Sequence, residues 1–71
     1  MTTALTIADA ISRSISHVEI VRVKFSGDIA DALSVVKSLA VEYDNTTEDD
    51  GDEDVWGTTA TGGEFRIRIA I

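Results

Sequence analysis

Seven of the thirteen acidic residues of this chain lie within eleven consecutive residues, 44–54, which contain no Lys or Arg. The six acids outside this stretch are balanced by all six bases, so the stretch accounts for the whole net charge of −7. Its Asn, Asp, Thr and Gly residues offer little apolar area to offset the loss of chain entropy on folding. We therefore predict that residues 44–54 form a solvated acidic loop and that the flanking segments form the fold.

The length of 71 residues predicts a single domain, 1–71, with the acidic loop inside it. With no Cys and one His, neither a disulfide nor a structural zinc site is expected. The earliest basic residue is Arg13, and every apolar run is shorter than about 18 residues, so neither a signal peptide nor a membrane span is predicted.

Two segments show apolar residues at helical spacing. The first is Thr6–Ile15, where Thr6 is the predicted N-cap. The second is Asp28–Tyr43, where Asp28 is the predicted N-cap and the acidic loop ends the helix.

Val18–Phe25 is rich in β-branched residues and predicts a strand. Val21, Val23 and Phe25 alternate with basic residues, but Val18 and Ile20 place apolar side chains on the other face. Either the first half of this strand is covered on both faces, or a bulge resets its register.

Val55–Ala60 and Glu64–Ile71 flank Thr61-Gly62-Gly63 and predict a C-terminal hairpin. A two-residue turn would place Trp56 in the core opposite Ile69, whereas a three-residue turn would direct it outward beside Arg68. We favour the two-residue turn, because a core this small benefits from its only Trp. The order α-β-α-β-β then predicts an α+β two-layer sandwich, with two helices on one face of a three-stranded sheet and the strand order left open.

No arrangement of residues indicates catalysis. His17 is the only His, and no phosphate-cradling Gly loop or Gly-x-Ser-x-Gly turn is present. Raising the pKa of a carboxyl group for acid catalysis requires desolvation, which the composition of the acidic loop opposes. We therefore expect a protein that is not an enzyme and needs no cofactor.

The many acidic side chains could in principle bind calcium. With Gly51 at the sixth position of an EF-hand loop, Thr46 falls at the first position and Gly57 at the twelfth, where Asp and Glu are required. No defined metal site is predicted, although weak binding of divalent cations stays open.

Glu48–Asp54 holds six carboxylates in seven residues. An extended chain advances about 3.3 Å per residue, so its charge density approaches that of one DNA strand, at about 3.4 Å per phosphate. Such a segment could occupy a groove lined by Lys and Arg that otherwise receives nucleic acid, while the simpler alternative is a loop that keeps the protein soluble. The predicted partner-binding residues are Asp44, Glu48, Asp49, Asp50, Asp52, Glu53 and Asp54, with Tyr43 and Trp56 as apolar anchors.

Four of the six bases, Arg22, Lys24, Arg66 and Arg68, alternate onto the face of the sheet away from the core. A basic sheet face can bind single-stranded nucleic acid, but the net charge opposes this and no aromatic residue is assigned to that face. The acidic loop could instead fold back and neutralise it. The sequence leaves this choice open.

In its length, low pI, lack of Cys, carboxylate run and lack of catalytic residues, the chain resembles the small acidic proteins that phages direct against host defences. These include anti-CRISPR proteins and DNA-mimic anti-restriction proteins. The resemblance implies an inhibitor in the bacterial cytoplasm that binds a protein with a basic nucleic-acid-binding surface, such as a CRISPR surveillance complex, and binds neither nucleic acid nor membrane. The alternative function is a regulatory or structural module of a larger assembly, with the acidic loop as a solubilising element.

Overall fold

Two helices and four strands follow one another in the order α-β-α-β-β-β across residues 7–70, the part of the chain that the computed structural model describes. The predicted α+β class is confirmed, whereas the prediction of three strands is wrong. The bounds are α1 Ile7–His17, β1 Val21–Lys24, α2 Ile29–Leu39, β2 Ala40–Thr47, β3 Glu53–Thr59 and β4 Glu64–Ala70.

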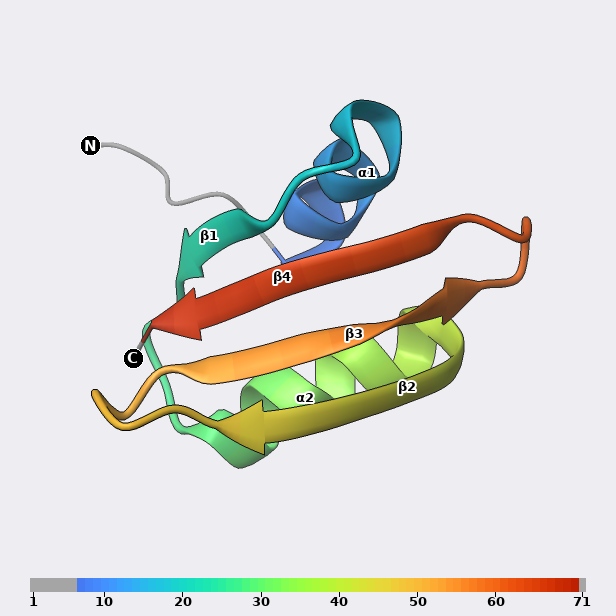
Figure 1. Ribbon diagram of the computed structural model, residues 1–71. Coiled ribbons are helices and arrows are strands. Elements are labelled where there is room, and N and C mark those ends of the chain that lie inside the picture. The colour runs from blue at the N-terminus through green and yellow to red at the C-terminus, as the bar shows by residue number, and fades with distance from the viewer. Residues whose placement is uncertain (1–6, 71) are drawn as a thin grey trace.

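The strands form one mixed sheet in the order β1-β4-β3-β2, in which β1 runs parallel to β4 and the other neighbours are antiparallel. Both helices lie on the same side of this sheet (Figure 1). We call the uncovered side the open face. β1 and β2 are the two edge strands, so α2, which connects them, crosses the covered face from one edge of the sheet to the other.

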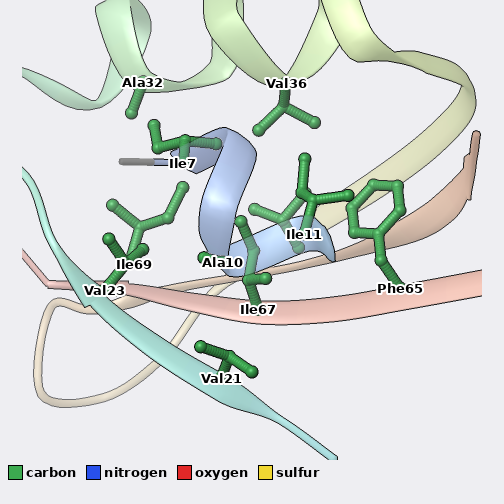
Figure 2. Close-up of a cluster of buried hydrophobic side chains, with 11 residues drawn as sticks. Ile7, Ala10, Ile11, Val21, Val23, Ala32, Val36, Phe65, Ile67 and Ile69 are labelled. Atoms are coloured by element: carbon green, nitrogen blue, oxygen red, sulfur yellow. The ribbon is translucent and has the colours of Figure 1, made fainter. Parts of the chain in front are cut away.

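The core lies between the helices and the covered face. Ile67 and Ile69 of β4 are fully buried and point toward side chains of both helices, among them Ile11 of α1 and Val36 of α2 (Figure 2). Helix α1 buries Ile7, Ala10, Ile11 and Ser14, which recur at helical spacing along one side. The small side chain of Ala10 is fully buried in the same cluster.

Helix α1 extends to His17, two residues beyond the predicted end, and its predicted cap Thr6 lies outside the described residues. The predicted strand Val18–Phe25 is shorter at both ends, as β1 Val21–Lys24. Val18 and Ile20 belong to the connection from α1 and are exposed. Their apolar character therefore reflects neither a bulge nor a strand covered on two faces.

Helix α2 begins as predicted, with the Asp28 side chain accepting a hydrogen bond from the Asp31 N–H at 3.0 Å. The predicted helix to Tyr43 is wrong, because Ala40 is already extended and β2 follows directly. The spacing of Leu39, Ala40 and Tyr43 fits a helix, but the β-branched and aromatic residues from Val41 to Thr47 favour a strand. Pairing of this segment with β3 decides between the two patterns.

The predicted acidic loop at 44–54 is also wrong. Residues 44–47 end β2, residues 53–54 begin β3, and a short turn joins the two strands. In this turn the Gly51 N–H donates to the Glu48 carbonyl at 2.9 Å, and the Glu48 N–H donates to the Asp52 carbonyl at 2.8 Å. Strand pairing with β3 thus orders a segment whose own composition opposes burial.

The β3–β4 hairpin closes on a turn with the same hydrogen bonds. The Gly62 N–H donates to the Thr59 carbonyl, and the Thr59 N–H donates to the Gly63 carbonyl, both at 2.9 Å. Gly51 and Gly62 occupy the same position in their turns, with φ angles of 91° and 87° that favour glycine. The predicted two-residue turn is therefore wrong, and the turn residues are Ala60, Thr61 and Gly62.

The observed turn moves Trp56 out of the core. Trp56 pairs with Arg66 rather than with Ile69 or Arg68, and its exposed fraction is 38%. Val55 takes the fully buried position opposite Ile67 instead. A core made of Val, Ile, Ala and Phe closes without the only Trp.

Candidate partner-binding surface

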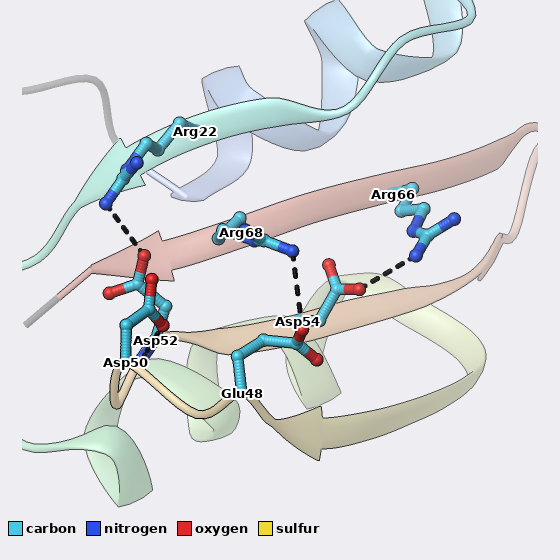
Figure 3. Close-up of polar contacts among 7 residues, drawn as sticks. All are labelled: Arg22, Glu48, Asp50, Asp52, Asp54, Arg66 and Arg68. Carbon is cyan, nitrogen blue, oxygen red and sulfur yellow. Dashed lines mark hydrogen bonds and ion pairs between the residues drawn. The ribbon is translucent and has the colours of Figure 1, made fainter.

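The acidic stretch meets the protein's own arginines across the open face (Figure 3). Asp52 pairs with Arg22 at 2.8 Å and Asp54 pairs with Arg66 at 2.9 Å. Glu48 lies 3.6 Å from the guanidinium of Arg68, a longer contact. The sequence left open whether the acidic stretch folds back on the outward-facing bases. In the structure it pairs with three of those four bases, Arg22, Arg66 and Arg68.

Strand register explains these ion pairs. Arg22 and Arg68 are direct neighbours across the β1–β4 pair, and Asp54 is directly opposite Arg68 across the β4–β3 pair. The carboxylate of Asp54 reaches diagonally to Arg66, on the same face two residues away. Each of these arginines is thus paired with a carboxylate, either of β3 or of the β2–β3 turn.

Asp54 is the most buried of the paired acids. Its side chain is 3% exposed, whereas that of Arg66 is 54% exposed. The hydrogen bond that the Arg66 guanidinium donates to Asp54, followed by the Coulombic attraction of that carboxylate, raises the pKa of Arg66 above its ordinary value. A raised pKa of a cation adds stability at lower pH that is lost only as the pH rises through that value, so this arginine stays charged under all ordinary conditions.

Glu53 points to the covered face and is buried. Its carboxylate accepts hydrogen bonds from the amide of Asn45 and from the Thr47 hydroxyl, the latter at 2.7 Å. These two donors come from β2, which lies next to β3. Glu53 therefore fastens β2 to β3 and offers no charge to a partner.

Three of the seven predicted acids stay exposed without an ion pair to any residue of 7–70. They are Asp44 on β2 and Asp49 and Asp50 in the turn. Asp44 and Asp50 accept hydrogen bonds only from the nearby backbone N–H groups of Asn45 and Asp52. The charge available to a partner is accordingly smaller than the acidic stretch contains.

A groove lies on the open face around Trp56. Tyr43 borders this groove, but it pairs with Gly57 and shares the face of Asn45, so its side chain packs against the core on the covered face. The carboxylates of Glu42, Asp44 and Glu64 lie along the groove. The structure thus brings together two predicted residues, Asp44 and Trp56, and separates them from Asp49 and Asp50 in the turn. We call this site the Trp56 groove. The predicted anchor Tyr43 is wrong, because its side chain packs against the core on the other face of the sheet.

The sequence interpretation missed Glu42, Glu64, Val18 and Ile20, all of which line the Trp56 groove. The alternation of β4 directs Glu64 to the open face together with Arg66 and Arg68, so the sequence pattern alone could have placed Glu64 there. Glu42 was assigned to a helix, so its position beside Trp56 depended on recognising β2.

Across residues 7–70, no group of three or more His, Asp or Glu side chains is arranged to hold a metal ion. His17 is the exposed last residue of α1. None of the helices in this part of the chain has the length and apolar character required to cross a bilayer.

Comparison of the chain with family models, with curated proteins and with solved structures finds no significant match.

Proposed function

We propose that this protein is a non-enzymatic inhibitor that binds a basic nucleic-acid-binding site on a host defence complex, in the manner of an anti-CRISPR or DNA-mimic protein. The supporting observation is the distribution of charge that remains after the internal ion pairs form. Three of the six bases are paired with acids, and the other three, Arg13, Lys24 and Lys37, lie on α1, β1 and α2. No ion pair joins the exposed acids of the β2–β3 hairpin, Asp44, Asp49 and Asp50, to a base within residues 7–70.

The proposed binding surface is narrower than the acidic stretch. Ion pairs or hydrogen bonds within the sheet already engage Glu48, Asp52, Glu53 and Asp54. The protein therefore does not present a continuous row of free carboxylates resembling a phosphate strand. The residues assigned to the partner are the exposed acids of the turn and of the Trp56 groove, with Trp56 as the apolar anchor: Asp49, Asp50, Glu42, Asp44 and Glu64. Concentrated negative charge attracts Lys and Arg and speeds association with a basic surface.

Plaque formation by a CRISPR-targeted phage tests the proposal, with the protein expressed in the bacterial host. We expect plaques to appear when the protein is present, and restriction-proficient hosts extend the same assay to restriction systems. Absence of protection in every CRISPR- and restriction-proficient host would overturn the proposed function.

Three charge-matched double variants locate the surface. The turn variant is Asp49→Asn with Asp50→Asn, the groove variant is Glu42→Gln with Glu64→Gln, and the helix variant is Asp9→Asn with Asp31→Asn. Each changes the net charge from −7 to −5. We expect the turn and groove variants to lose protection and the helix variant to retain it. Equal loss in all three would show that overall charge, rather than this surface, is responsible.

A second candidate function is an interaction module that adds a partner strand to β2. The observation that favours it is the position of β2 as an eight-residue edge strand with mostly exposed side chains. Strand addition relies on main-chain hydrogen bonds, so its affinity would change little with salt. The inhibitor proposal instead predicts steep weakening of the complex as salt rises.

A further inference from the structure

We propose that the Trp56 groove binds an extended segment of the partner protein in which basic and apolar residues alternate. This inference rests on the proposed function, because it specifies how a basic partner is recognised. The site combines exposed apolar side chains with acidic residues that line the same groove.

The groove forms where β1 stops short of β4. The four residues of β1 begin opposite Ile67, so the earlier part of β4 has no strand beside it on that side. The connection between α1 and β1 takes this place, and it supplies Val18 and Ile20 to the groove. Trp56 on β3 supplies the aromatic surface.

Exposed apolar side chains converge on this groove. Val18, Ile20 and Trp56 are 90%, 48% and 38% exposed, and they are three of the six large hydrophobic residues exposed within 7–70. They come from two segments distant in the sequence but line one site. Exposed apolar groups gathered in this way mark a surface that a partner covers.

The backbone holds Val18 in a conformation that its side chain disfavours. The Val18 N–H donates to the Ser14 carbonyl at 2.9 Å and caps α1, with a φ angle of 53°. Glycine normally occupies this position after a helix, because a β-branched residue is strained there. The fold thus keeps an exposed, strained valine where glycine would be more stable, and Val18 lies at the groove.

The charges around the groove define the occupant. Glu19, Glu42, Asp44 and Glu64 line it, and the one base among its lining residues is Arg66, whose guanidinium is already paired with Asp54. The surplus of negative charge attracts Lys and Arg and repels nucleic acid. A second copy of this chain would bring the same carboxylates and is disfavoured for the same reason.

A peptide titration tests the inference. The probe is the hexapeptide acetyl-Arg-Leu-Arg-Leu-Arg-Leu-amide, and the signal is the fluorescence of Trp56, the only Trp of the chain. We expect a saturable blue shift with this probe, weaker binding when Ser replaces each Leu, and no binding when Glu replaces each Arg. The groove variant should weaken binding about fivefold to tenfold through loss of two exposed charge contacts. The turn variant should stay within about twofold of wild type, because its charges are remote from the groove.

Val18→Gly separates binding from folding. Glycine relieves the strain and removes the apolar side chain, so this variant should be at least as stable as wild type to urea while its affinity for the probe falls. Unchanged affinity in a stable Val18→Gly protein would overturn the assignment of Val18 to the site.

The inference and the proposed function fail separately. No saturable signal with the Arg-Leu probe, or equal weakening by the turn and groove variants, would overturn the groove as the site. Protection in the phage assay would leave the proposed function intact in that case. Conversely, the groove variant could weaken peptide binding as expected while the protein protects phage in no host. That result would support the groove as a peptide-binding site and contradict the inhibitor proposal.

Discussion

The hydroxyl oxygen of Ser14 lies 2.7 Å from the backbone nitrogen of Arg66 and accepts a hydrogen bond from that N–H. The same hydroxyl lies within hydrogen-bond distance of the carbonyls of Arg66 and Glu19, at 2.8 and 2.9 Å. Here β1 has not yet begun, so a side chain of α1 replaces the missing strand partner of β4. One buried hydroxyl joins α1, β4 and the connection that borders the Trp56 groove.

Ser14→Ala should lower the free energy of unfolding by about 1–3 kcal/mol, because the backbone N–H of Arg66 would be left buried without an acceptor. Urea denaturation followed by circular dichroism measures the change. Ser12→Ala, at an exposed position of the same helix, is the matched control and should change stability by less than about 0.5 kcal/mol. An equal effect of both substitutions would show that the Ser14 hydrogen bonds contribute nothing specific.

The three ion pairs of the open face should differ in their contribution to stability. Asp54→Ala should lower the melting temperature most, since its carboxylate is nearly inaccessible to water, and Asp52→Ala should lower it less. Glu48→Ala should change the free energy of unfolding by no more than about 0.5 kcal/mol, because its pair is long and partly exposed. Thermal melts of the three variants test this order, and a largest loss for Glu48→Ala would contradict it.

Gly51→Ala should destabilise the protein by about 1–2 kcal/mol, because an L-residue with a side chain is strained at positive φ. No atom lies within 4 Å of the position that the added Cβ would occupy, so the effect is one of backbone conformation alone. Gly51→Asn should cost less, since Asn tolerates this region better than Ala. Urea denaturation of the two variants is the measurement, and equal stability of Gly51→Ala and wild type would exclude the observed turn.

Trp56→Ala should destabilise the protein less than Ile67→Ala, although it removes the larger side chain. Ile67 is fully buried, and its truncation should cost about 2–5 kcal/mol. Trp56 lies on the open face and is partly solvated, so much of its surface is never removed from water. A larger loss from Trp56→Ala in the same denaturation experiment would restore Trp56 to the core.

The sequence predicts α1, the beginning of α2 and the final strand well, because their patterns are local. The Asp28 cap, the helical spacing in α1 and the alternation of β4 each follow from neighbouring residues. By contrast, residues 40–47 fit two periodicities, and their pairing with β3 decides between them. The sequence also contains the pattern of a three-residue hairpin turn at both places. Glycine is the third residue of Asp49-Asp50-Gly51 and of Ala60-Thr61-Gly62, the position that adopts positive φ in such turns.

The candidate site was predicted in part. The sequence directs Arg22, Arg66 and Arg68 to the open face, but which acid each one meets depends on strand order and register. The strand order β1-β4-β3-β2 brings distant segments together, and no local pattern specifies it. Glu42 and Val18 join Trp56 only in the folded chain, so the groove could not be derived from spacing.

The two identical turns have a consequence for the order of folding. They join β2, β3 and β4 into a meander whose contacts close over short chain segments at small entropic cost. Val21, by comparison, must find Ile67 near the opposite end of the chain. We expect the meander to assemble first and the parallel β1–β4 pair, with α1 docked beside it, to complete the transition last.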